Sequence, residues 1–193
     1  ILESLRQYNS GKHVDTRIYA LLYESKILYQ KKLIHQSRKQ LEKAKKMAVD
    51  FEKHLLLLEI LSWEESILSE ESYSNNSGDE LMKILKEDNA VIEMIKNTLS
   101  YKMLYAKPME IYRREGKLPA QKDMARIEKI LQDPLLKDRK NLLSFQDHKY
   151  AYYINSLCYE LTGDKANSNK YRKKLVELME SHPEQIKDGM GNY

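Results

Sequence analysis

Residues 152–178 read YYINSLCYELTGDKANSNKYRKKLVEL. Apolar and aromatic side chains recur there at three- and four-residue spacing on both sides of Gly163, which is typical of α-helices. Each half holds one serine, a small residue: Ser156 before the glycine and Ser168 after it. Because glycine readily adopts the positive φ that ends a helix, Gly163-Asp164 predicts a tight turn. The stretch therefore predicts two antiparallel helices joined by a short turn.

The same helical spacing extends over most of the chain, with glycine or proline at several of the predicted boundaries. A loop is predicted at 72–78, and Ser77 and Glu80 within and after it have the spacing of a capping box. In the long helix that follows, Asp88-Asn89 is a candidate interruption and Pro108 a candidate kink. The predicted helices cover about 15–31, 33–48, 50–71, 79–115, a shorter segment between Pro119 and Pro134, 145–161 and 165–180, and Pro183 opens a further one. We therefore expect an all-α fold of about seven antiparallel helices.

The composition excludes several classes of protein. The chain has 193 residues, of which 41% are hydrophobic and 32% are charged, with 6 glycines and 4 prolines. Collagen-like, linker-like and low-complexity chains need far more glycine and proline. A disordered chain has fewer leucines, isoleucines and tyrosines, and a turn-rich β-sandwich needs more turn residues. A helical protein with a continuous apolar core remains.

The net charge of +4 is spread unevenly along the chain, and two segments carry opposite net charges. Residues 31–53 carry eight lysines and arginines against three acids, whereas residues 59–80 carry seven acids and no lysine or arginine. This alternation suits the solvated faces of neighbouring helices better than one nucleic-acid-binding stripe. Apart from Phe51, the basic segment also lacks aromatic side chains on which bases could stack. We therefore do not expect nucleic acid as a partner.

Cys158 is the only cysteine, which excludes an intrachain disulfide and multi-cysteine zinc sites. This favours a reducing compartment, and we expect a cytoplasmic protein. The sequence has no run of about 18 apolar residues, so no membrane span is predicted. Because it begins at Ile1 rather than at Met, we expect a fragment of a longer chain.

Residues 149–182 resemble a tetratricopeptide (TPR) unit. With Gly163 at the turn position of that family, Ser156 and Ser168 fall on the two small positions at which the paired helices pack closely. Tyr159 falls on the aromatic position between them. The resemblance implies that this helix pair is one unit of a stacked array.

Residues 18–51 give the same alignment. Lys32 takes the turn position, where the family has glycine, and Ser25 and Ser37 take the small positions. The two turn positions are 131 residues apart, which is not a multiple of the 34-residue repeat, so we expect irregular long helices over 50–144. The resemblance, which extends to bacterial TPR-like proteins of unassigned function, implies a single TPR-like domain over 1–193. Its antiparallel helix pairs are expected to stack as a right-handed α-α superhelix.

Tyrosine is the unusual residue, with 14 copies against two phenylalanines and one tryptophan. In TPR proteins the first helix of each pair lines the concave groove, and tyrosine suits an interface because its ring buries area while its hydroxyl stays hydrated. The alternative is that these tyrosines fill contacts between helices, and both interpretations remain open. The partner-binding residues that the resemblance implies are Tyr19, Tyr23, Lys26, Tyr29, Tyr150, Tyr153 and Glu160.

Patterns that signal catalysis or a bound cofactor are missing from the sequence. It contains neither GxxxxGK[ST] nor GxGxxG, and its five histidines lack metal-ligand spacing. We interpret Glu64-Glu65 and Glu70-Glu71 as a solvated acidic helix face and Cys158 as a small buried hydrophobe. We therefore expect no catalytic residue, no cofactor and no metal.

The hypothesis that these observations favour is a non-catalytic scaffold. It would bind another protein, a peptide or other parts of its own full-length chain through the shape and side chains of a groove. One alternative is a regulatory or sensory module that controls an attached output domain or nucleic acid. Another is an enzyme whose site the residue spacing does not reveal.

Overall fold

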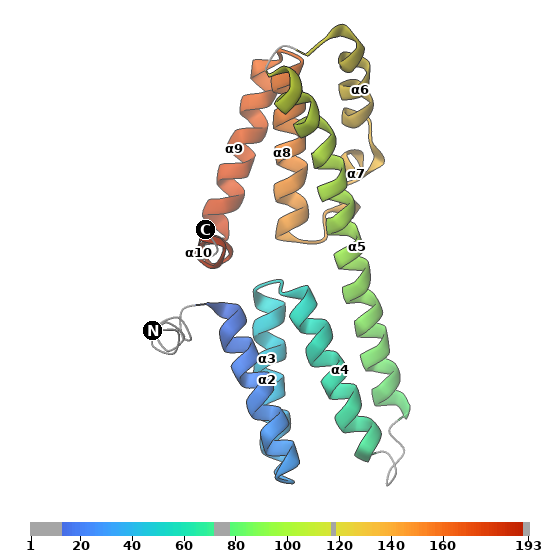
Figure 1. Cartoon of the computed structure of the whole chain (residues 1–193), viewed down its shortest axis with the longest axis vertical. Coiled ribbons are helices and arrows are strands. Elements are labelled where there is room, and N and C mark those ends of the chain that lie inside the picture. The colour runs from blue at the N-terminus through green and yellow to red at the C-terminus, as the bar shows by residue number, and fades with distance from the viewer. Residues whose placement is uncertain (1–12, 72–77, 117–118, 191–193) are drawn as a thin grey trace. The chain divides into compact units, whose positions relative to one another are not determined.

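The computed structural model describes residues 13–71, 78–116 and 119–190, and within them the regular structure is entirely helical (Figure 1). This confirms the all-α prediction. Of the loop predicted at 72–78, residues 72–77 with the capping residue Ser77 lie outside the described residues, and Gly78 already belongs to the helix that follows. The helices are α2 (Val14–Gln30), α3 (Ile34–Asp50), α4 (His54–Glu71), α5 (Gly78–Glu115), α6 (Gln121–Leu131), α7 (Pro134–Lys137), α8 (Phe145–Leu161), α9 (Lys165–Ser181) and α10 (Pro183–Met190), with the 3₁₀ turn η1 (Arg139–Asn141) between α7 and α8.

Several helix limits differ from those that the sequence predicts. Helix α4 begins at His54 instead of near position 50, because α3 continues to Asp50 and a turn occupies 51–53. The division expected at Asp88-Asn89 is wrong, since α5 runs through it and continues past Pro108. Pro183 opens α10 as predicted. The one-turn helix α7 is additional, and with α10 it brings the α-helices among the described residues to nine, against about seven expected.

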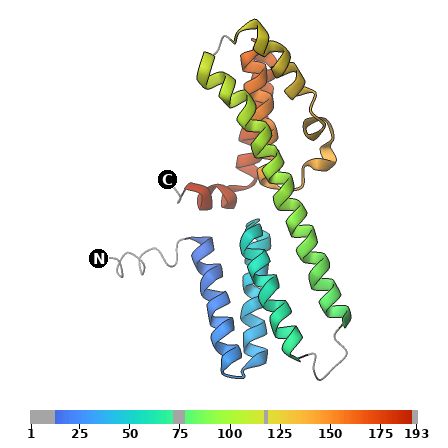
Figure 2. The same cartoon turned by 45° about the vertical axis from the view of Figure 1, so that its right-hand side comes forward.

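The described residues form two compact units. Unit 1 comprises those up to 95 together with 184–190, and unit 2 comprises those from 96 to 183. Each unit has its own apolar core, and residues of α5 contribute to both. Figure 2 shows α5 as one continuous helix, drawn in green. Ile84 and Val91 belong to the core of unit 1, whereas Tyr101 and Ile111 belong to that of unit 2. The long helix therefore supplies residues to two separate cores. That the chain forms a single domain stays a prediction.

Two helix pairs pack closely, α2 with α3 in unit 1 and α8 with α9 in unit 2 (Figure 1). In the first pair, Ser37 Oγ donates a hydrogen bond to the backbone carbonyl of Ser25 at 2.9 Å. In the second, Ser168 Oγ donates to the carbonyl of Ser156 at 3.0 Å. All four serines are buried. The predicted helix pairs are confirmed, and one serine-to-carbonyl contact recurs where the small residues of each pair meet.

The serine contact of unit 1 extends to α4 through the only tryptophan of the chain. Trp63 Nε1 donates to Ser25 Oγ at 3.2 Å, and Ser25 Oγ lies 3.0 Å from Ser37 Oγ. Because Ser37 gives its single hydroxyl hydrogen to the carbonyl of Ser25, the hydroxyl of Ser25 donates to Ser37. The side chains of three helices are therefore joined by one directed series of hydrogen bonds.

The turns that end α2 and α3 use non-glycine residues in the left-handed conformation. Lys32 has φ of 62° and Glu52 has φ of 51°. The N–H groups of Lys32 and Leu33 donate to the carbonyls of Tyr29 and Leu28, which is the hydrogen-bond pattern of a Schellman motif. Gly163, at the corresponding place after α8, has φ of 79°. The alignment of Lys32 with a glycine position thus has a conformational basis.

Lys32→Gly is expected to raise the free energy of unfolding of unit 1 by about 0.5 kcal/mol, because it removes the steric cost of left-handed backbone but adds freedom to the unfolded chain. Urea denaturation followed by Trp63 fluorescence measures the change. Lys31→Gly is the matched control, since Lys31 has φ of −84° and gains only unfolded-state entropy. A control that is stabilised as much as Lys32→Gly would contradict the conformational explanation.

Unit 2 contains a buried carboxylate that joins α5 to the start of α8. Asp147 is fully buried. Its Oδ1 accepts a hydrogen bond from Thr98 Oγ1 at 2.5 Å, and its Oδ2 accepts from Asn97 Nδ2 at 2.8 Å and from the backbone N–H of Leu143 at 3.2 Å. Both oxygens accept hydrogen bonds, and the groups that donate them are partly buried. Asp147 thus satisfies donors from two segments that are distant in sequence.

Candidate functional site

The predicted partner-binding tyrosines of α2 differ in how much of each side chain is exposed. Tyr19 is 52% exposed and Tyr23 is 66% exposed, so both rings are accessible on unit 1. Tyr29 is 9% exposed and packs edge-on against Trp63, with ring centroids 5.5 Å apart. Its hydroxyl donates to Glu70 Oε2 at 2.5 Å. Tyr29 therefore fills a contact between helices, as the alternative interpretation of the tyrosines has it.

Lys26 lies between the exposed tyrosines and the Tyr29 contact along α2. Its Nζ lies 5.7 Å from the centroid of the Trp63 ring and 3.5 Å from Glu59 Oε1 on α4. The side chains of Lys26 and Glu59 are 38% and 44% exposed. We call the surface formed by Tyr19, Tyr23 and Lys26 the tyrosine face. It reaches α4 through the contacts of Lys26 with Trp63 and Glu59.

The remaining predicted residues belong to unit 2 and are engaged within it. Tyr150 and Tyr153 are half-buried, and their rings lie 5.7 Å and 5.9 Å from that of Tyr105 on α5. Glu160 forms an ion pair with Arg172 of α9. These contacts favour the interpretation in which the tyrosines of α8 fill space between helices.

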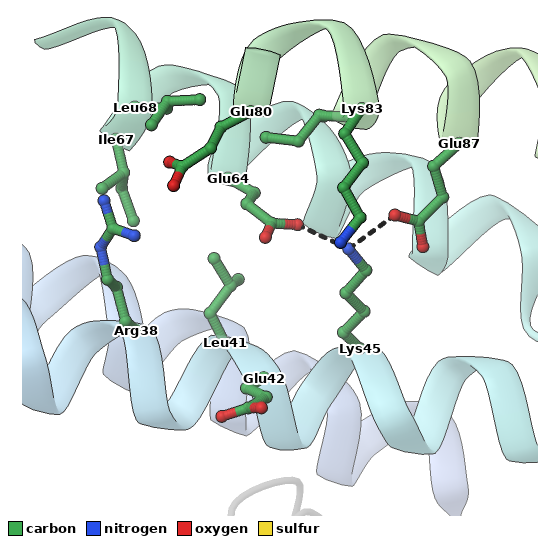
Figure 3. A pocket seen from close by; sticks show the side chains of 11 residues that line it. Arg38, Leu41, Glu42, Lys45, Glu64, Ile67, Leu68, Glu80, Lys83 and Glu87 are labelled. Atoms are coloured by element: carbon green, nitrogen blue, oxygen red, sulfur yellow. Dashed lines mark hydrogen bonds and ion pairs between the residues drawn. The ribbon is translucent and has the colours of Figure 1, made fainter. Parts of the chain in front are cut away.

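A pocket that the sequence analysis missed opens between α3, α4 and α5 of unit 1, with a volume of about 690 Å³ (Figure 3). Its floor is aliphatic and buried, and its rim is charged. The pocket forms because α5 is not one of the closely packed helices of the unit. The floor consists of Leu41, Ile67, Leu68 and Ile84, and the rim consists of Arg38, Glu42, Lys45, Glu64, Glu80, Lys83 and Glu87.

Helical spacing directs these side chains to one place. Arg38, Glu42 and Lys45 follow one another at four and three residues on α3, and Glu80, Ile84 and Glu87 do the same on α5. Each helix therefore presents one continuous row toward the pocket. The rows are visible in the sequence, but the sequence does not show that they face each other across a cavity.

One lysine connects all three walls of the pocket. Lys45 Nζ lies 2.8 Å from Glu64 Oε2 on α4 and 2.8 Å from Glu87 Oε2 on α5 (Figure 3). Burial alone lowers the pKa of Lys45, but the hydrogen bonds to the two carboxylates outweigh it and raise the pKa above its ordinary value. The ammonium therefore stays charged. Glu64, which the sequence placed on a solvated acidic helix face, thus forms an ion pair with Lys45 of α3.

Negative charge predominates on the α5 side of the pocket. The pKa of Asp88 is raised by burial and then by the neighbouring carboxylates of Glu65 and Glu87. The repulsion that raises this pKa acts despite the nearby positive charge of Lys45. At Asp88 the carboxylates of Glu65 and Glu87 therefore outweigh the charge of Lys45.

We also searched the part of the chain that the structure describes for a metal site, a membrane-spanning helix and a reactive thiol. No group of three or more histidine, cysteine, aspartate or glutamate side chains there is arranged to hold a metal ion. None of the helices among these residues combines the length and apolar character needed to cross a membrane. Cys158 is fully buried in unit 2, and burial raises the pKa of its thiol to about 12.

Cys158 is therefore expected to react with Ellman's reagent far more slowly in the folded protein than in urea, because the thiolate is the reactive form. At neutral pH the reaction should follow the opening of unit 2. The same thiol in the urea-unfolded chain provides the control for intrinsic reactivity. Rapid stoichiometric labelling of the folded protein would show that the thiol is neither buried nor protonated.

No protein-family model, curated protein or solved structure matches this chain.

Proposed function

We propose that the chain is a non-catalytic scaffold of TPR-like stacked helix pairs that binds another protein or a peptide. The observation that carries this proposal is the α3–α4–α5 pocket, because it combines a buried aliphatic floor with a charged rim. Its volume lies within the range of about 300–1,000 Å³ that is usual for ligand pockets. Aliphatic side chains of a partner would bury area on the floor, and the rim would set their orientation.

The tyrosine face supports the same function independently. Tyr19 and Tyr23 expose large rings on unit 1, and tyrosine is among the residues that contribute most to binding interfaces. The recurrence of the serine-to-carbonyl contact in α2–α3 and α8–α9 supports the TPR-like part of the proposal. A scaffold of this type acts through shape and side-chain complementarity and needs no reacting group.

Affinity capture with the immobilised chain tests the proposal. Two variants address the surfaces separately: Tyr19→Ala with Tyr23→Ala removes the exposed rings, and Ile84→Phe fills the pocket. Lys173→Ala with Glu177→Ala is the control, since this pair lies on α9 with side chains 80% and 60% exposed. Circular dichroism establishes that each variant is folded.

The expected result is a partner that binds the original chain and the control but is lost with at least one unit 1 variant. Saturable binding of the purified partner, measured by calorimetry, then gives the loss as a change in affinity of about tenfold or more. Capture of nothing, or capture that is equal for all variants, would overturn the proposed function.

A further inference from the structure

The α3–α4–α5 pocket has a charge balance that selects among possible partners. Its lining carries four carboxylates, of Glu42, Glu64, Glu80 and Glu87, against three cations, of Arg38, Lys45 and Lys83. Lys45, moreover, is shared between two of the carboxylates. The lining therefore retains a negative charge after its internal ion pairs are counted, and it complements a cationic partner.

The two carboxylates that hold Lys45 come from different helices and converge on one point. Glu64 Oε2 and Glu87 Oε2 each lie 2.8 Å from the same ammonium nitrogen (Figure 3). This is a site built for one cationic head group with several N–H donors, and a guanidinium or an ammonium satisfies it equally well. The aliphatic floor beside it accommodates apolar side chains of the same ligand.

The ammonium of Lys45 can be displaced from its position between Glu64 and Glu87. Its side chain is 23% exposed, and it reaches the carboxylates on a flexible four-carbon stem from the opposite wall. Rotation about that stem would carry the ammonium away from the two carboxylates. An incoming cation would then take over the same two hydrogen bonds, so the exchange leaves no carboxylate unpaired.

We propose that the α3–α4–α5 pocket binds a peptide segment with an arginine or lysine between apolar residues, whose head group replaces Lys45 between Glu64 and Glu87. This inference rests on the proposed function and names the chemistry of the partner. Lys45 serves as an internal competitor that occupies the cation site when no segment is bound. Binding of the segment is accordingly weakened by Lys45 and not assisted by it.

The test uses fluorescein-labelled peptides of sequence Ser-Leu-Leu-Arg-Leu-Leu-Ser with blocked termini, and measures fluorescence anisotropy with the full chain. A matched peptide carries citrulline, the neutral isostere of arginine, and a second replaces the leucines by serine. The arginine peptide is expected to bind about tenfold more tightly than the citrulline peptide, because charge-assisted hydrogen bonds are lost with the charge. The serine peptide is expected to show no saturable binding.

Two variants predict opposite effects on the arginine peptide. Lys45→Met should increase its affinity about fivefold or more, because the internal competitor is removed. Glu64→Gln with Glu87→Gln should abolish the preference for arginine over citrulline. Trp63 fluorescence and circular dichroism establish the folding of each variant, and the citrulline comparison needs no variant at all.

Equal binding of the arginine and citrulline peptides, or weaker binding to Lys45→Met, would overturn the cation site. If affinity capture still succeeds in that case, the proposed function stands and only the partner chemistry is wrong. If capture and all peptides fail together, the proposed function itself is overturned.

Discussion

Replacing Asp147 by alanine is expected to lower the free energy of unfolding of unit 2 by about 3–4 kcal/mol, because three partly buried donors lose the fully buried carboxylate that accepts their hydrogen bonds. Thr98 Oγ1 and the backbone N–H of Leu143 would be left without this acceptor. Asn97 would keep only its hydrogen bond to the carbonyl of Asn141, at 2.6 Å. The contact that joins α5 to the start of α8 would be lost.

Urea denaturation monitored by Cys158 reactivity measures this effect, since the thiol is buried in the same helix. Asp138→Ala is the matched control in unit 2. The carboxylate of Asp138 accepts one exposed backbone hydrogen bond, from Lys140 N at 3.0 Å, so its loss should lower the free energy of unfolding by about 1 kcal/mol or less. Equal destabilisation by the two alanines would show that Asp147 does not organise the unit.

Ser37→Leu is expected to destabilise unit 1 by about 3 kcal/mol, and by more if α2 and α3 separate. Ser37 is fully buried, and its Oγ lies 2.9 Å from the backbone carbonyl of Ser25. The larger side chain cannot enter this space without moving one helix away from the other. The substitution also removes the acceptor to which the Ser25 hydroxyl donates.

The variant Ser37→Ala separates the effect of side-chain size from that of the hydrogen bonds. It removes the hydroxyl but still lets α2 and α3 approach closely. It should lower the free energy of unfolding by about 1 kcal/mol. Trp63 fluorescence in urea reports both variants, because the indole N–H donates to Ser25. If leucine and alanine cost the same, the small size of the residue is not what the helix pair requires.

The helix pairs and their turns were predictable because their signals are local. Apolar spacing located α8 and α9 to within a residue, and Gly163 marked the turn between them. The serines were recognisable because they lie at matched distances from each turn. Pro183 opened α10 because proline suits the first turn of a helix.

The helix boundaries that the sequence did not predict correctly depend on backbone conformations that no particular residue type marks. Glu52 adopts a positive φ between α3 and α4, although nothing distinguishes it in the sequence from an exposed helical glutamate. Asp88-Asn89 continues α5 because tertiary packing of Ile84 and Val91 on either side outweighs the weak helix preference of these two residues. Local preference is a poor guide where the surrounding core fixes the backbone.

Sequence alone thus determined the all-α class and the two close helix pairs, since each follows from the order of residues within one or two turns. The place of the serines at the helix contacts was implied by the resemblance to TPR units. Only the tertiary structure decided that α5 supplies two cores, that Tyr29 is buried, and that Lys45 meets Glu64 and Glu87. These outcomes depend on which faces of separate helices meet. Because each residue turns a helix face by about 100°, small differences in rotation decide whether a charged row faces solvent or a pocket.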